Sequence, residues 1–205
     1  ARGQFLLDSE ANLKEGLAKL EAPEATSVDP ETPLSEIPVD DQALAEIDHF
    51  TDMALYFHEA LTDDYDIDPL FVDPAIDLAP VLQNRFANTK LTPVIQASEA
   101  ALVAARNSSG ENALATHLAQ LVSALKPWLL EGAPQHYRDA GLTLYRDKAT
   151  GHYWLQENGA VSNPYSADGE EKIDWPDPMA GMSMNTNGNE AGSDQASNNS
   201  EDGHD

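Results

Sequence analysis

Apolar residues recur at helical spacing along consecutive stretches of the chain. The first stretch spans about 41–61 and places these residues on one face: Leu44, Ile47, Phe50, Ala54, Phe57 and Leu61. Asp73-Pro74 has the form of an N-cap followed by a proline at the first helical position, and it predicts a second helix ending near Phe86. A third helix is expected from Thr92-Pro93 to Arg106.

A fourth helix follows Ser108 and Glu111, which have the spacing of a capping box. Its apolar stripe comprises Leu114, Leu118, Leu121, Leu125, Trp128 and Leu129. Pro127 is expected to bend the final turn, because proline lacks the amide hydrogen that a helix uses. Four amphipathic helices in succession predict a mainly α fold, an antiparallel four-helix bundle. We expect these residues in its core: Phe57, Leu118, Leu121 and Leu125.

The hydrophobic period changes after Gly132. Residues 142–145 and 152–155 are β-prone runs separated by a turn-forming segment, and they predict a small C-terminal β-hairpin over 142–156. Residues 185–205 contain no Lys or Arg and no apolar residue larger than alanine, so we expect a disordered acidic tail there.

The first forty residues divide into two parts. Residues 4–7 are an apolar strand end, and leucines at the spacing of a short helix follow. Four prolines among acidic and small residues then predict an extended, self-repelling linker. The expected organisation is a strand and helix remnant at 1–22, the linker at 23–40, a helical domain with the hairpin at 41–178, a Met-rich segment at 179–184 and the tail at 185–205.

Acidic residues dominate the charge of the chain. The 36 Asp and Glu oppose 11 Lys and Arg, which leaves a formal net charge of -25. Duplex binding relies on Lys and Arg that neutralise phosphates, so nucleic acid is excluded as a partner and an anionic membrane surface is disfavoured. The absence of cysteine excludes disulfides, Cys-based zinc sites and thiol catalysis. Cations are the natural counterparts of such a chain.

Three of the four methionines lie close together, at Met179, Met182 and Met184. Thioethers are soft ligands that select Cu(I) and, by the same softness, Ag(I). The segment lies outside any core stripe, on a backbone that contains Gly and Ser and can fold around one ion. Metal binding and incidental tail composition are both open interpretations, and Trp175 can add its π-face to a metal site.

Histidines supply a second set of candidate ligands. His49 and Met53 are spaced i, i+4 on the first helix, so both can face one ion. His58 and His117 flank or join apolar stripes, where we expect hydrogen-bonded core histidines instead. The candidate metal ligands are therefore Met179, Met182, Met184, His49 and Met53.

Other chemistry finds little support. Asp64, Asp66 and Asp68 imitate the start of a calcium loop, but Pro69 stands at the turn position and Ala75 at the final ligand position. An acidic loop after a helix end is expected there. No pairing of a nucleophile with a base and no Gly-rich phosphate loop emerges, so the chain is not expected to be an enzyme or to hold a catalytic cofactor.

Two stretches resemble known families. Residues Gly3 to Leu13 are similar to the segment with which CusB-type periplasmic adaptors close their membrane-proximal β domain; these are HlyD-like membrane fusion proteins of heavy-metal RND efflux pumps. Residues from about Ile47 to Tyr165 resemble a helical periplasmic domain of unassigned function that is often associated with copper. That second resemblance rests on Ala60 to Asp64, Tyr153 to Leu155 and Asn163 to Tyr165.

The chain departs from the second family at its cysteines. That family often carries Cys-Pro-Met before the Tyr-Trp-Leu run and Met followed by Cys-Gly after the Asn-Pro-Tyr run. Here the corresponding places hold Leu142 to Lys148 and Trp175 to Met184, without cysteine. The thiolate part of an inherited copper site is therefore missing, which leaves the methionines as candidates.

The resemblance implies a periplasmic adaptor subunit, present as a C-terminal fragment, of a Cu(I)/Ag(I) RND efflux system in a Gram-negative cell. Its implied partners are the inner-membrane RND metal pump, an outer-membrane channel protein and a periplasmic copper chaperone. Its implied role is binding and assembly rather than chemistry. Two alternatives stay open: a stand-alone periplasmic module that buffers copper, and a structural interaction domain that binds no metal.

Overall fold

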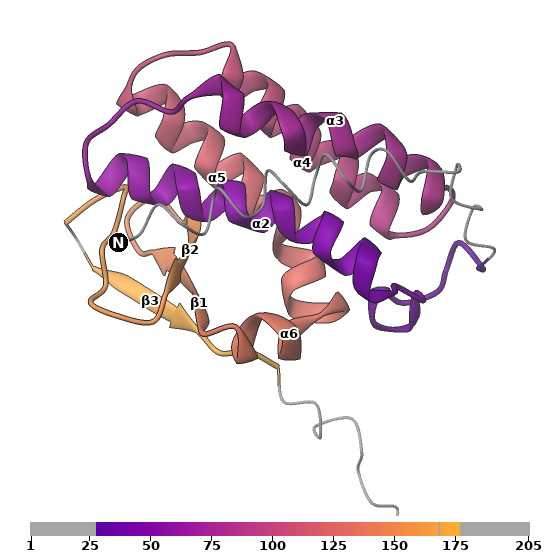
Figure 1. Cartoon of the computed structure of the whole chain (residues 1–205). Coiled ribbons are helices and arrows are strands. Elements are labelled where there is room, and N and C mark those ends of the chain that lie inside the picture. Colours follow the sequence, from indigo (N-terminus) through magenta and orange to yellow (C-terminus); the bar gives the residue numbers. More distant parts are fainter. Residues whose placement is uncertain (1–27, 168, 177–205) are drawn as a thin grey trace, which may run out of the picture.

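The computed structural model describes residues 28–167 and 169–176. Its elements are η1 (Leu34–Glu36), α2 (Asp41–Thr62), α3 (Pro69–Arg85), α4 (Leu91–Arg106), α5 (Glu111–Pro127), η2 (Trp128–Gly132), α6 (Pro134–Asp139), β1 (Leu142–Asp147), β2 (Tyr153–Glu157) and β3 (Glu170–Ile173). The structure is mainly helical and carries a small antiparallel sheet (Figure 1). A mainly α fold with a small β part is therefore confirmed. The predicted remnant at 1–22, the Met-rich segment and the acidic tail lie outside the described residues.

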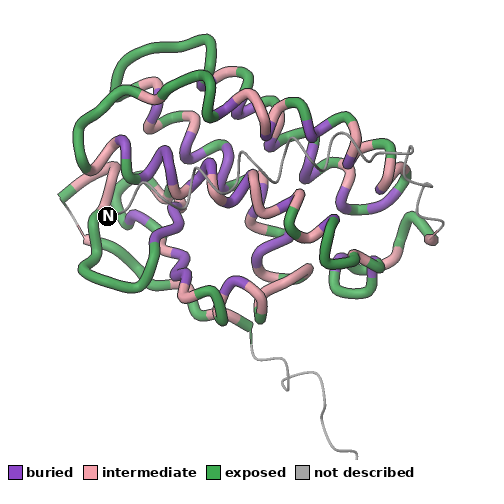
Figure 2. Tube along the Cα trace, viewed as in Figure 1, coloured by how far each residue is buried: buried purple, intermediate pink, exposed green. Residues whose placement is uncertain are grey.

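The four long helices bury the apolar faces that the sequence predicts. α2 packs against α3 and α5, and α4 packs against the same two helices. Figure 2 shows buried stretches recurring along these helices, whereas their connections are largely exposed. The predicted core residues are all fully buried: Phe57, Leu118, Leu121 and Leu125.

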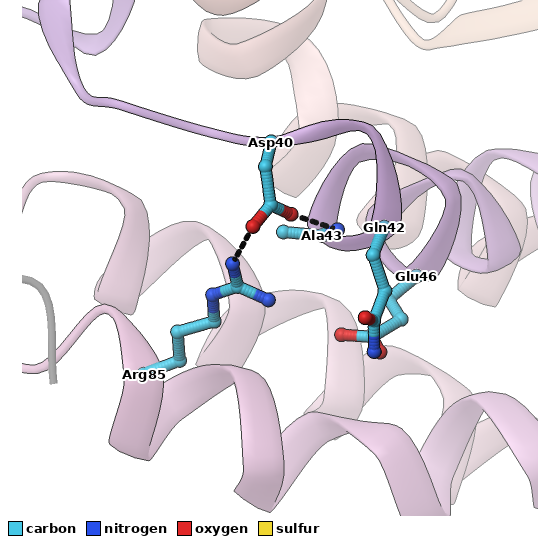
Figure 3. Close-up of polar contacts among 5 residues, drawn as sticks. All are labelled: Asp40, Gln42, Ala43, Glu46 and Arg85. Carbon is cyan, nitrogen blue, oxygen red and sulfur yellow. Dashed lines mark hydrogen bonds and ion pairs between the residues drawn. The ribbon is translucent and has the colours of Figure 1, made fainter. Parts of the chain in front are cut away.

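Asp40 fixes the start of α2 (Figure 3). Its Oδ1 atom accepts a hydrogen bond from the Ala43 amide at 2.8 Å, which satisfies one of the free N–H groups at the helix N-terminus. Its other carboxylate oxygen pairs with the Arg85 guanidinium at the end of α3. The bond from Ala43 and the contact with Arg85 hold the pKa of Asp40 below its usual value, although burial opposes them. The start of α2 is thereby tied to the end of α3.

The second long helix begins earlier than predicted. α3 starts at Pro69, and Asp68 is its N-cap because the Asp68 carboxylate accepts a hydrogen bond from the amide two residues later at 2.9 Å. The Asp68 amide also donates to the Tyr56 hydroxyl at 2.8 Å, which fixes the entry into the helix. The prediction that Asp73 caps this helix is wrong: Asp73 lies inside α3 and pairs with Arg106 of α4 at 2.8 Å. An Asp-Pro pair occurs at both 68–69 and 73–74, and the hydrogen bond to Tyr56 of α2 favours the first pair as the helix start.

The predicted capping box at Ser108 and Glu111 is also wrong. The N-cap of α5 is Gly110, and no side chain caps this end. The φ angle of Gly110 is 93°, in the left-handed region that favours glycine. Ser108 instead donates from Oγ to the Ala104 carbonyl oxygen at 2.5 Å, and so satisfies the C-terminal end of α4.

The second half of the predicted linker is packed rather than extended. Leu34 and Ile37 are buried, and η1 contacts η2. The Leu34 amide donates to Oε1 of Glu131 at 2.8 Å. Because the two apolar side chains stand three residues apart, a short 3-10 turn buries both of them on one face. The packed part of the chain therefore begins before residue 41.

α5 ends at Pro127, and the chain continues through a π-helical turn, η2. A Cβ atom at Gly132 would lie 2.0 Å from the Trp128 ring, so only glycine fits at the end of this turn. The Trp128 ring is buried and donates from Nε1 to the Tyr137 hydroxyl at 2.8 Å. That hydrogen bond holds α6 against the turn.

The predicted hairpin is present, and a third strand extends it. β1 and β2 pair antiparallel, with Leu144 opposite Leu155 and Tyr145 opposite Trp154. β3 pairs with the other edge of β1, although residues 170–173, three of which are charged, give no sign of a strand. β2 packs on α2 and α5, and both Trp154 and Leu155 are fully buried. The sheet and the helices therefore share one hydrophobic core.

Candidate functional site

Asp147, at the end of β1, organises a network of hydrogen bonds. Its fully buried carboxylate accepts from the Thr150 amide at 2.7 Å and from Thr150 Oγ1 at 2.6 Å. It also accepts from Asn163 Nδ2 at 2.8 Å and from Ser166 Oγ at 2.6 Å. Burial opposes ionisation, but the hydrogen bonds from Ser166, Thr150 and Asn163 hold the pKa of Asp147 well below its usual range. The network folds residues 163–166 back onto the hairpin turn.

Two of the stretches that carry the second family resemblance, 153–155 and 163–165, lie against one another beside this network. The Tyr165 hydroxyl donates to the Tyr153 carbonyl oxygen at 2.8 Å. The rings of Tyr165 and Trp154 meet edge to face, with centroids 6.0 Å apart. His58 of α2 donates from Nε2 to the Ser162 carbonyl oxygen at 2.8 Å, one turn before the end of that helix. The helix, the hairpin and the following loop therefore form one unit.

The predicted role of His58 as a hydrogen-bonded core histidine is confirmed. Its side chain is buried, and burial lowers the pKa of the imidazole, although the hydrogen bond to Ser162 opposes this. His117 is also hydrogen-bonded, through Nε2 to Ser108 Oγ at 2.8 Å and through Nδ1 to Gln120 at 3.1 Å. It is only partly buried on α5, so it is not a core residue.

Titratable groups gather where α2 faces α6. His136 Nε2 lies 2.8 Å from Oδ2 of Asp48, while Asp48 Oδ1 is buried without a hydrogen-bond partner. Burial and the charge of Asp48 raise the pKa of Asp52, one turn further along α2, to about 6. Burial lowers the pKa of His49, although Asp48 and Glu46 oppose this. Burial in this cluster therefore disfavours the charged forms of both Asp52 and His49.

The structure places only part of the predicted metal site. His49 is half-buried on α2, whereas Met53 is buried in the hydrophobic core. Met179, Met182 and Met184 lie outside the described residues. In residues 28–167 and 169–176, no group of three or more His, Cys, Asp or Glu side chains is arranged to hold a metal ion. Trp175, the predicted π-donor, stacks on Tyr137 and donates from Nε1 to the Leu142 carbonyl oxygen at 2.9 Å.

Replacing Asp52 with Asn is expected to stabilise the protein at pH 7. The folded-state pKa of about 6 exceeds the usual value of 3.8, so the ionised carboxylate disfavours folding above pH 6. At about 1.4 kcal/mol for each pKa unit, the gain is between about 1 and 3 kcal/mol. It should shrink as the pH falls through 6 and be lost near pH 4, where both states bind the proton. Urea unfolding at several pH values measures this.

Asp77→Asn, an exposed substitution on α3, is the matched control, since it removes one charge of the same kind and should change stability by less than about 0.5 kcal/mol. Equal effects of Asp52→Asn and Asp77→Asn at pH 7 would contradict the burial of an unfavourable charge at Asp52. A gain that persists unchanged to pH 4 would assign the effect to packing instead.

A cleft of about 330 Å³ opens at the end of the helices where the α2–α3 and α4–α5 connections lie close together (Figure 1). The first connection contributes Asp64, Tyr65 and Asp66, and the second contributes 108–110, followed by Glu111 at the start of α5. Both sides supply carboxylates, and apolar side chains from the adjoining helix ends also line the cleft. The lining therefore combines acidic and apolar residues.

The roles of several of these residues are not predictable from the sequence. Asp147 reads as an ordinary turn residue, and its partners at 163 and 166 are too distant in sequence to suggest a network. The turn signal in Asp147 to Gly151 is the available clue, since a short-range Asp to Thr150 bond is typical of such turns. Asp52 lies on a predicted helix, but its burial depends on how α2 packs.

Comparison with known proteins gives no assignment: no family model matches the chain, and neither does a curated protein or a solved structure. None of the helices in the described ranges is long and apolar enough to cross a membrane.

Proposed function

We propose that this chain is the C-terminal part of a periplasmic adaptor subunit of a copper and silver RND efflux system. In this role it binds Cu(I) or Ag(I), passes the ion toward the inner-membrane RND pump, and helps to join that pump to an outer-membrane channel protein. A periplasmic copper chaperone is the proposed source of the ion. The four long helices are proposed to be an antiparallel four-helix bundle that carries the sheet.

One observation supports this proposal above the others. Residues 153–155 and 163–165, which resemble the terminal signature of the helical periplasmic family, meet through the Tyr165 to Tyr153 hydrogen bond and the ring contact with Trp154. His58, two residues before the matching stretch on α2, is bonded to the same loop. Separate parts of a resemblance that meet in space fit a shared structural unit better than chance similarity does.

The proposed mechanism is binding and assembly. The net charge of -25 favours cation attraction over attraction of anions. Soft thioethers at Met179, Met182 and Met184 favour a monovalent soft ion over Zn(II) and Ca(II), which prefer nitrogen, thiolate or oxygen ligands. A stand-alone copper-buffering module is the alternative that keeps the metal site but not the pump.

Under reducing conditions the full chain is expected to take up one Ag(I) or Cu(I) and to ignore Zn(II) and Ca(II). Replacing Met179, Met182 and Met184 together with Leu should abolish this uptake while folding survives, because Leu keeps most of the volume and removes the sulfur. Affinity should fall only slightly between about pH 7 and 5, since thioethers do not titrate. Competitive Cu(I) titration measures both effects.

Met53→Leu tests the alternative ligand pair by the same change, because it removes the buried thioether beside His49 on α2. Equal affinities of the native chain and the triple variant would move the site to His49 and Met53. Absence of uptake by either form would favour the structural domain. Silver uptake without co-purification of the RND pump from the native host would favour the buffering module over the adaptor.

A further inference from the structure

Exposed apolar side chains of the described residues concentrate at one end of the helices. Five large apolar side chains are exposed among the described residues, and one of them, Val161, belongs to the loop after β2. The other four are Tyr65 at 39%, Leu70 at 73%, Phe71 at 37% and Val103 at 39% exposure. The first three follow one another from the α2–α3 connection into the first turn of α3.

Val103 belongs to the same surface although it comes from α4. Arg106 pairs with Asp73 at 2.8 Å, which brings the last turn of α4 against the first turns of α3. Val103 precedes Arg106 by three residues, and Leu70 precedes Asp73 by three residues. Each apolar side chain therefore stands on the same helical face as one member of the ion pair.

The two exposed aromatic rings of this surface, Tyr65 and Phe71, pack against the ring of Tyr56. The Tyr56 ring lies 6.2 Å from the Tyr65 ring and 5.8 Å from the Phe71 ring, measured between centroids. Tyr56 is itself buried and accepts the hydrogen bond from the Asp68 amide that starts α3. A surface that is ordered before binding loses little conformational freedom when a partner covers it.

Carboxylates border the same surface. Tyr65 also lines the 330 Å³ cleft, whose walls carry Asp64, Asp66 and Glu111. None of the residues that line this cleft is Lys or Arg. The neighbouring cation, Arg106, is already paired with Asp73. The cleft is therefore a place where an additional positive charge is favoured.

We propose that this acidic aromatic end, defined as Tyr65, Leu70, Phe71 and Val103 with the cleft beside them, docks a basic amphipathic segment of a partner protein. A Lys or Arg side chain of the partner enters the cleft, and its apolar side chains cover Leu70 and the two rings. A second copy of this chain, which also carries a net charge of -25, is repelled from this end. The inference goes beyond the proposed efflux role and does not depend on it.

The probe for this proposal is a synthetic 14-residue amphipathic helix of Leu and Lys, paired with the same peptide carrying Glu in place of Lys. At about 0.15 M salt, where exposed charges are screened beyond about 8 Å, the Lys peptide should bind the full chain and the Glu peptide should not. Fluorescence anisotropy of the labelled peptide gives the dissociation constant. Binding of both peptides with equal affinity would overturn the proposal.

Pairs of site and control variants distinguish binding at this surface from attraction to the overall negative charge of the chain. Asp64→Asn with Asp66→Asn should weaken binding of the Lys peptide about tenfold, as should Leu70→Ser. The controls remove the same kinds of group from residues outside the defined surface: Asp77→Asn with Glu157→Gln for charge, and Val161→Ser, in the loop after β2, for apolar area. Both controls should leave the affinity within about twofold.

Equal losses in the site and control variants would show that the peptide follows net charge alone, and would overturn the proposal. Analytical sedimentation of the chain without peptide tests whether a second copy of the chain occupies this surface. A dimer that Leu70→Ser dissociates would assign the surface to a second copy and would also overturn it, whereas a monomer is the expected result.

Discussion

Replacing Asp147 with Ala is expected to lower the free energy of unfolding by about 3 kcal/mol or more. The change leaves four donor groups, on Thr150, Asn163 and Ser166, without their acceptor. A buried donor that loses its partner costs about 1–3 kcal/mol, and solvent entering the opened loop recovers part of the sum. Because the same loop is bonded to α2 through His58, the loss should appear in the global unfolding transition.

Acid should reduce the difference between the native chain and Asp147→Ala. The folded-state pKa of Asp147 is depressed, so its contribution is fully present above the usual value of about 3.9 and is lost as the pH falls through the folded-state pKa. Urea unfolding followed by tryptophan fluorescence at pH 7 and at about pH 3 measures the two cases. Glu157→Ala, an exposed change on β2, should stay within about 0.5 kcal/mol at both. A loss at Asp147 no larger than this control would contradict the network.

Leu121→Ala should cost about 2–5 kcal/mol, the range for removing a large side chain from a packed core. Leu121 is fully buried on α5, the helix that contacts both α2 and α4. Denaturant unfolding of this variant and of Gln120→Ala, its exposed neighbour, measures the effect against a surface change on the same turn. A loss below roughly 0.5 kcal/mol for Leu121→Ala would place the core elsewhere.

Periodicity carried most of the helical prediction. The 3.6-residue repeat depends only on which side of a helix faces the core, so Phe57 and Leu118 are correctly expected to be buried. Helix starts depend instead on single contacts. Asp68 and Asp73 both precede proline, and contacts with other helices distinguish them: Asp68 bonds to Tyr56 of α2, whereas Asp73 pairs with Arg106 of α4. A local pattern contains no information about those neighbours.

The sheet likewise has a part that the sequence predicts and a part that it does not. β1 and β2 have β-prone residues and a turn between them, and their hairpin is predictable. β3 is an edge strand whose residues 170–173 are mostly exposed and charged, so its pairing with β1 comes from backbone hydrogen bonds that any sequence can supply.

Spacing alone also does not predict which candidate metal ligands are buried. The i, i+4 rule puts His49 and Met53 on one side of α2, but it does not say whether that side is buried. Met53 stands three residues after Phe50 and four before Phe57, both fully buried, and so continues the core stripe. The contact between Asp48 and His136 could not be predicted from spacing at all, because its 2.8 Å distance joins residues 88 positions apart.

The hydrogen bond between His58 and Ser162 has a consequence for synthesis on the ribosome. Its two residues are 104 positions apart, and β2, which covers the same region of α2, is nearly as distant. At about 5–20 residues per second, α2 leaves the exit tunnel roughly 5–20 s before the strand and loop that complete its surroundings. During that interval the apolar side of α2 is incompletely covered, so the nascent chain depends on α3 and α5, or on a chaperone, to shield it.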